Sequence, residues 1–314
     1  MSRAGLTGQV EVDFVIDTEG RVVNPHVVSS NNPWFERPAI EAILQWQFTP
    51  AEYAGQKVSL RTRQLVIFNY EGDGPAEGLW QIKKAKDHDK QPPELQWDQP
   101  PVPVNTAFPV YPFEALRAGV KGKTRLAFVV GPDGHIYSSK IMEATTPELG
   151  QAVLAMIDTW IFQPAHKKDG TPALAAVAIE HEFKPTGRGD APVSDEARAI
   201  LRDLEKQPAA IVTLKDVDKA VKPLSQRPPV YPTGLLKAGQ PGDAMIEFFI
   251  DRNGDAQLPR IISSSAPEFG YAAAQAVATW RFEVPRKGGK RVVVRVRVPI
   301  EFNWKAAPPV KQEP

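Results

Sequence analysis

Three stretches of the chain alternate apolar and polar residues, and each alternation predicts a β-strand that is buried on one face. Each stretch begins at a glycine: Gly8, Gly122 or Gly242. The alternating apolar residues are Val10, Val12, Phe14 and Ile16, then Leu126, Phe128 and Val130, then Ile246, Phe248 and Ile250. Turn sequences rich in Asp, Asn and Gly follow, and second strands are expected at 21–29, 135–143 and 255–263. Each stretch therefore predicts a β-hairpin.

After each hairpin the apolar residues change to helical spacing. Thr146 and Ser265 place a hydroxyl just before a proline and an acidic residue, a pattern typical of the start of a helix. The apolar stripes are Phe35, Ala39, Ala42, Ile43 and Trp46; Leu149, Val153, Met156, Ile157 and Trp160; and Phe269, Ala273, Ala276, Val277 and Trp280. A third strand is expected at 57–68, 173–183 and 291–302.

Fixed spacing shows that these elements form one repeated unit. Counted from its first glycine, each copy has Gly at 12, Trp at 38 and Phe at 40 residues further on, and the copies start about 115 to 120 residues apart. We therefore expect three small domains and not a solenoid. The expected boundaries are repeat one at 1–70, a linker at 71–98, repeat two at 99–186, a linker at 187–218, repeat three at 219–304 and a tail at 305–314.

Proline-rich segments lead into the second and third repeats. Each contains Tyr-Pro, at Tyr111 and Tyr231, and is followed by a short helical sequence that ends in glycine. The fold class is therefore α+β, with each module a small antiparallel three-stranded sheet and two helices packed on one face. The first repeat lacks the start of its lead-in helix, so we expect further sequence, with a signal or membrane anchor, upstream of Met1. The linker at 187–218 contains one more predicted helix, capped by Ser194.

Composition narrows the classes of function. The 314 residues carry a formal net charge of +1, which argues against a nucleic-acid partner, and no apolar run is long enough to span a membrane. There are no cysteines, and the five histidines share no metal-ligand spacing, so neither a metal nor a cofactor is expected. Asp17 and Asp251 precede hairpin turns, where turn capping explains them better than acid–base chemistry. No nucleophile motif is present, and an enzyme is not expected.

The repeated Trp-x-Phe could form an aromatic binding groove, but a core role is favoured. Truncation of a buried Trp or Phe typically costs about 3–5 kcal/mol, a large share of a small module's stability. The residues assigned to the core are Trp46, Phe48, Trp160, Phe162, Trp280, Phe282, Tyr111 and Tyr231.

The last strand of a repeat carries basic residues on one face. These are Arg291, Arg295 and Arg297 in repeat three and Lys57, Arg61 and Arg63 in repeat one, whereas repeat two has Ala176 and Ala178 there. Exposed charges can protect a sheet edge from aggregation. They can also select acidic or polar segments of a partner strand that adds to the edge. Both interpretations stay open, and they are compatible.

The ordered motifs resemble the C-terminal domain of TonB-type energy transducers. The matching features are Tyr-Pro, a short helix, a strand opened by Gly, a hairpin, a helix that ends in Trp-x-Phe and a final strand, and the three copies cover most of the chain outside its linkers. The resemblance implies a periplasmic module that grips an extended segment of an outer-membrane transporter by strand addition. It also implies transmission of force, in support of transport across the membrane.

The sequence departs from that family pattern in three places. It has three such domains, and Val284 replaces the proline that follows Trp-x-Phe. Just before Tyr-Pro, where well-known members of the family carry a glutamine that meets the transporter, it has Phe108 and Pro228, so Phe108 and Gln226 join the basic residues as candidate partner contacts. We expect a periplasmic array that binds a transporter or another envelope protein. The alternative is a structural spacer whose sheet edges pair with one another by self-association.

Overall fold

The computed structural model describes residues 8–30, 35–53, 55–68, 82, 88–185 and 193–303. These residues divide into two compact units, of which one holds the first repeat and the other holds the second and third repeats. The expected tail and most of residues 69–87 lie outside the described part. No helix in the described part is long and apolar enough to cross a membrane.

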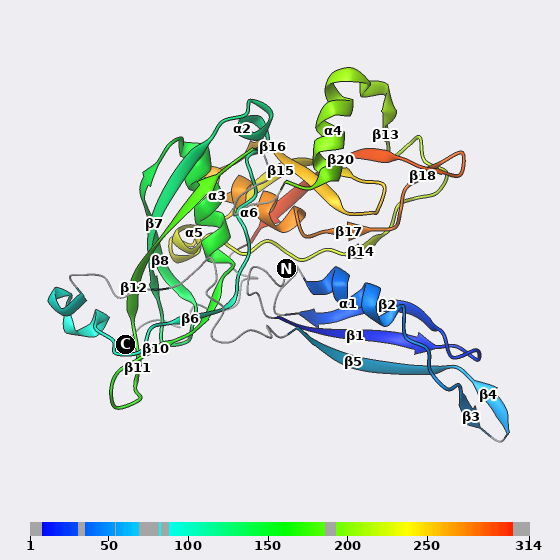
Figure 1. Ribbon diagram of the computed structural model, residues 1–314. Helices are drawn as coiled ribbons and strands as arrows, with labels where there is room; N and C mark the ends of the chain where they lie inside the picture. Colours follow the sequence, from blue (N-terminus) through cyan, green and yellow to red (C-terminus); the bar gives the residue numbers. More distant parts are fainter. Residues whose placement is uncertain are drawn as a thin grey trace. The chain divides into compact units, whose positions relative to one another are not determined.

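The first repeat is a three-stranded antiparallel sheet with a helix against it (Figure 1). Its elements are β1 (Gly8–Ile16), β2 (Val22–Ser30), α1 (Glu36–Ile43), β3 (Ala51–Tyr53), β4 (Gln56–Val58) and β5 (Leu60–Phe68). The strand order is β2-β1-β5, so the first strand of the repeat lies in the middle. The predicted hairpin and helix are therefore present.

The second repeat has the same sheet order, β12-β7-β8. Its elements are α2 (Phe113–Arg117), β7 (Gly122–Val130), β8 (Ile136–Ala144), α3 (Pro147–Asp158), β9 (Ile161–Gln163), β10 (Ala165–His166), β11 (Pro172–Ala173) and β12 (Ala175–Phe183). The 3-10 helices η3 (His88–Lys90) and η4 (Pro93–Leu95) and strand β6 (Val102–Asn105) precede it. The predicted cap at Thr146 is confirmed, because its side chain accepts a hydrogen bond from the Leu149 N–H.

The third repeat has a sheet of four strands in the order β13-β20-β15-β16. Its elements are β14 (Pro223–Ser225), α5 (Thr233–Lys237), β15 (Gly242–Ile250), β16 (Ala256–Ser264), α6 (Pro267–Val277), β17 (Arg281–Phe282), β18 (Arg286–Lys287), β19 (Lys290–Arg291) and β20 (Val293–Phe302). The preceding linker forms α4 (Asp195–Lys206), η5 (Pro208–Ala210) and β13 (Ile211–Thr213). The helix predicted after Ser194 is confirmed, since the Ser194 hydroxyl accepts from the Ala197 N–H. The extra strand β13 was not expected.

One hydrogen bond explains the fixed spacing of Gly and Phe in the repeat. The Phe162 N–H donates to the Gly134 carbonyl at 2.9 Å, and Phe282 does the same to Gly254 at 2.8 Å. Gly134 has a φ of +80°, and a Cβ at this position would lie 2.0 Å from the Phe162 carbonyl oxygen. The position therefore requires glycine for both its conformation and the close approach.

Two details of the sequence-based expectation are wrong. The Ser265 hydroxyl does not cap α6, whose N-cap is Ala266; it accepts instead from the Asp243 N–H at 2.8 Å. The last strand of each repeat is also not continuous from 57, 173 or 291, because a short hairpin arm precedes the long strand. The arms are β3–β4, β10–β11 and β18–β19. Turn capping by Asp17 and Asp251 is confirmed, since each carboxylate accepts two backbone N–H groups of its turn.

Candidate functional site

The outer edge of each sheet is the place where a partner strand could add. Among the described strands, β5 in repeat one and β12 in repeat two pair on one side only, with β1 and β7. In repeat three the corresponding edge of β20 is occupied by β13, which pairs with it in parallel: Ile211 lies opposite Val293, Val212 opposite Val294 and Thr213 opposite Arg295. The third repeat therefore differs from the first two at this edge.

The arginines of β5 bind a carboxylate of the central strand. Arg63 Nε lies 2.6 Å from Asp13 Oδ1, and an Arg61 terminal nitrogen lies 2.8 Å from Asp13 Oδ2. Asp13 is buried, although it faces away from the repeat's hydrophobic core. Hydrogen bonds from Arg63 and then Arg61 lower the pKa of Asp13 to about 2. The arginine side chains remain more than half exposed, so they can still meet a partner.

Repeat three builds the same arrangement with other residues. Arg297 Nε lies 2.7 Å from Oε2 of the buried Glu247, and Arg295 lies over the Phe249 ring. In repeat two, Ala127 and Ala178 lie opposite each other at the positions that correspond to Asp13 and Arg63. The arginines of these strand faces therefore belong to clusters in which they pair with carboxylates on the outer surface of the sheet. Sequence periodicity found the arginines but not their carboxylates, which lie about 50 residues away in the chain.

Lys57 and Arg291 do not lie on the sheet edges. Lys57 pairs with Glu52 in the β3–β4 arm, and Arg291 pairs with Arg286 in the β18–β19 arm. The expectation that these two residues lie on the long edge strand is therefore wrong, because each lies in the short arm that precedes it, and their contact with a partner stays a prediction.

Phe108 takes part in a contact within the chain. Its carbonyl accepts from Gln275 Nε2 at 2.8 Å, and the Val110 N–H donates to Gln275 Oε1 at 3.1 Å. The side chain of Phe108 is half-buried. The backbone of Phe108 thus joins repeats two and three, and the expected contact of its side chain with a partner stays a prediction. Gln226 is exposed beside β14, and its role stays a prediction.

Most of the assigned core aromatics are buried. Trp160, Phe162, Trp280, Phe282 and Tyr111 are each at most 8% exposed, and Tyr231 and Phe48 are half-buried. Trp46 is different, because 37% of it is exposed, and its assignment to the core is wrong.

Trp280 also binds the lead-in segment of its own repeat, because its Nε1 donates to the Arg227 carbonyl at 2.8 Å.

Repeats two and three pack on each other through their helices. Helix α3 lies against α6, and each lead-in helix reaches the other repeat, α2 against β16 and α5 against β8. Arg260 on β16 pairs with Glu114 of α2 at 2.6 Å and lies over the Phe113 ring. Contacts of this reciprocal kind resemble those of a symmetric dimer made within one chain.

A half-buried aspartate lies in this contact. Asp158, at the end of α3, accepts from the Thr233 hydroxyl at 2.8 Å and from the Thr233 N–H at 3.2 Å. Burial raises the pKa of Asp158 to about 6, although the hydrogen bonds from Thr233 oppose the shift. Sequence reasoning missed this pair, because the two residues lie 75 positions apart and neither belongs to the repeated pattern.

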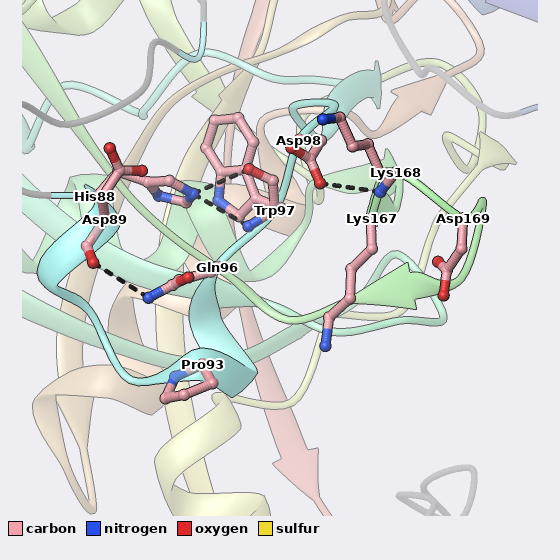
Figure 2. A pocket seen from close by; sticks show the side chains of 9 residues that line it. All are labelled: His88, Asp89, Pro93, Gln96, Trp97, Asp98, Lys167, Lys168 and Asp169. Carbon is pink, nitrogen blue, oxygen red and sulfur yellow. Dashed lines mark hydrogen bonds between the residues drawn. The ribbon is translucent and has the colours of Figure 1, made fainter.

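A pocket of about 350 Å³ lies where the first linker meets the β10–β11 arm (Figure 2). His88 Nε2 accepts from the Trp97 N–H at 3.0 Å, and the Lys168 N–H donates to Asp98 Oδ2 at 2.8 Å. Figure 2 shows that these bonds tie the linker together and attach it to the arm. Across the described residues there is no group of three or more His, Asp or Glu side chains that could hold a metal ion.

Comparison with known proteins identifies the repeated unit. The sequence profile of the family described as Gram-negative bacterial TonB protein C-terminal matches three times, at residues 1–70, 107–185 and 227–304. A protein named TonB from Xanthomonas campestris is 30% identical over 79 residues, and one from Vibrio cholerae is 32% identical over 88 residues. These alignments cover 25% and 28% of this chain, and the chain spans about a third of each relative, 35% and 36%.

A solved structure is also similar. The solution NMR structure of the Pseudomonas aeruginosa TonB C-terminal domain is 30% identical, covers 31% of this chain and 93% of its own, and has a TM-score of 0.25. The three profile matches together cover most of the described sheets and helices. The chain therefore belongs to the TonB C-terminal family and carries three copies of its domain.

Proposed function

We propose that this chain is a periplasmic array that binds extended segments of an outer-membrane transporter or another envelope protein by strand addition. The single observation that carries the proposal is the unpaired outer edge of β5 in the described part of repeat one. An open edge offers backbone donors and acceptors to a partner strand. The family and the named relatives support an envelope partner.

The side chains beside the β5 edge favour a partner that is partly apolar and partly acidic. Leu60, Leu65 and Ile67 are 47–51% exposed, an unusual density for one strand. Arg61 and Arg63 lie between them on the same strand, with side chains 70% and 52% exposed. A partner strand would place apolar side chains beside the first set and acidic ones near the arginines.

Repeat two offers a second open edge with different chemistry. The outer side of β12 is unpaired in the described residues, but its outward positions include Ala176 and Ala178 in place of the arginines. An array with unlike edges would bind different segments of one partner, and linkage would raise the effective concentration at the second edge.

Binding of backbone-modified peptides tests strand addition. Synthetic peptides that cover the periplasmic end of an outer-membrane transporter from the same genome are added to the ¹⁵N-labelled chain. We expect amide shifts along residues 60–68, and loss of those shifts when alternate peptide amides are N-methylated, because methylation removes edge hydrogen bonds. Unchanged spectra at saturating peptide would reject the proposal. Equal binding of the methylated peptide would reject strand addition.

The structural-spacer alternative requires edges of different repeats to pair. In the described part of the chain, none of the three main sheets contains strands of two repeats. The contact between repeats two and three is made instead by helices. Hydrogen exchange separates the two functions, since a spacer predicts slow exchange of β5 amides in the isolated chain.

A further inference from the structure

The segment 194–218, named here the linker clasp, binds the third repeat at three places. At its start, Ser194 Oγ donates to Gln257 Oε1 at 2.9 Å. Ile200 of α4 is fully buried, and Arg252 of the third repeat pairs with Asp203 at 3.4 Å. Helix α4 is thus held against the third repeat by both apolar and charged contacts.

The middle of the clasp occupies the edge of β20. Strand β13 pairs in parallel with residues 293–295, and Val212 packs against the hydrophobic core of the third repeat. A strand paired with this edge uses the backbone donors and acceptors that an added partner strand would need.

The end of the clasp binds the basic β18–β19 arm. Asp218 accepts from the Gly288 and Gly289 N–H groups at 2.7 and 2.9 Å, and its own N–H donates to the Arg286 carbonyl at 2.8 Å. Asp216 lies 3.9 Å from Lys287 Nζ. Two acidic residues of the clasp therefore bind the basic arm of this repeat, through its backbone N–H groups and Lys287.

The described part of the linker before repeat two contacts its following arm through an aspartate, but it forms no strand that corresponds to β13. When the two linkers are aligned on Tyr111 and Tyr231, Asp98 corresponds to Asp218, and it likewise accepts from a backbone N–H of the following arm. The positions of Val212 and Thr213 are taken by Pro92 and Pro93. Proline has no N–H to donate to a neighbouring strand, which accounts for the absence of a strand beside β12 among the described residues of this linker.

We propose that the linker clasp is a resident ligand of the third repeat, which holds the β20 edge closed to other strands, whereas no described strand occupies the corresponding edges of β5 and β12. The inference rests on the proposed strand addition. It also assigns a class of ligand to the β20 edge. This ligand is a short parallel strand of two apolar residues and one hydroxyl residue, followed by acidic residues, as in residues 211–218.

The test uses the full chain and a synthetic peptide of residues 208–218. Val212→Pro/Thr213→Pro copies the first linker and should open the edge. We expect the peptide to shift the amides of residues 293–295 in this variant, with affinity at least tenfold higher than in the unchanged chain. A peptide of scrambled sequence should cause no shift. The readout is independent of any transporter peptide at β5, so the two proposals can fail separately.

Two results would overturn the inference. One is equal affinity of the peptide for the unchanged chain and the variant. The other is absence of binding to the variant while amide signals of α6 and β15 stay native. If the proline variant loses those signals, a second variant replaces residues 208–218 with a Gly–Ser segment of the same length. Loss of the native signals in both would show that the clasp is part of the domain's core and not a ligand.

Discussion

Asp158 and Thr233 join the second repeat to the third, through two hydrogen bonds that the Thr233 hydroxyl and N–H donate to the Asp158 carboxyl group. The folded-state pKa of about 6 is higher than the ordinary value of 3.8. The folded protein therefore binds the Asp158 proton more tightly than the unfolded chain does. The stability that it contributes is fully present below pH 4 and is lost as the pH rises through 6, by roughly 3 kcal/mol in total.

Asp158→Asn should remove this pH dependence. We expect the free energy of unfolding of the second and third repeats, measured with urea, to fall less between pH 5 and pH 7.5 in the variant than in the unchanged chain. Burial lowers the pKa of His181 to about 4, which makes stability fall as the pH drops below 6.5. That trend is common to both proteins, so their difference isolates Asp158. Identical pH slopes would contradict the assignment.

Gly134→Ala should destabilise repeat two much more than Gly170→Ala. Both glycines have positive φ, +80° and +83°, so both substitutions carry a backbone cost of about 1–2 kcal/mol. Only at Gly134 would the new Cβ meet a carbonyl oxygen, that of Phe162 at 2.0 Å, whereas nothing lies within 4 Å at Gly170. Thermal unfolding of the two variants measures the difference. Equal losses would show that the Gly–Phe contact does not constrain the fold.

Arg63→Gln should raise the pKa of Asp13 from about 2 toward 3.8, because Arg63 makes the largest contribution to its low value. NMR titration of the Asp13 carboxyl carbon gives this pKa directly. Arg21→Gln is the matched control, since Arg21 pairs with Asp17 in the turn between β1 and β2 and its loss should leave Asp13 unchanged. A pKa of Asp13 that stays at about 2 in Arg63→Gln would show that Arg61 alone holds the carboxylate.

Trp280→Ala and Trp46→Ala should differ in the stability that they cost, although the two tryptophans occupy the same position of the repeat. Trp280 is 8% exposed and donates to the Arg227 carbonyl, so its loss should cost about 3–5 kcal/mol. Trp46 is 37% exposed, and we expect a loss of about 1 kcal/mol. Urea unfolding of each unit tests this. Comparable losses would mean that Trp46 is supported by contacts as extensive as those of Trp280.

Local patterns were enough to predict the repeated unit. Alternation, helical spacing and turn residues depend on neighbours within about ten positions, and these predicted the hairpins, the helices and the linker helix after Ser194. The position of Gly134 was also visible in the sequence. Its reason, the approach of the Phe162 carbonyl, was not visible, because that contact joins two elements.

The roles of the basic residues could not be predicted in the same way. The sequence placed Arg63 and Arg297 on a strand face, but their carboxylate partners Asp13 and Glu247 lie on another strand and are identified only by register. A one-residue change of register would have moved every side chain to the other face.

By itself, the sequence determined that this chain contains three TonB C-terminal domains, each with a hairpin, a helix and a closing strand. Only the tertiary structure decided that repeats two and three pack through α3 and α6, and that β13 adds to β20 whereas no described strand adds to β12. The reason is physical. Repeated local patterns fix what each domain is, whereas the use of its edges depends on contacts between segments far apart in the chain.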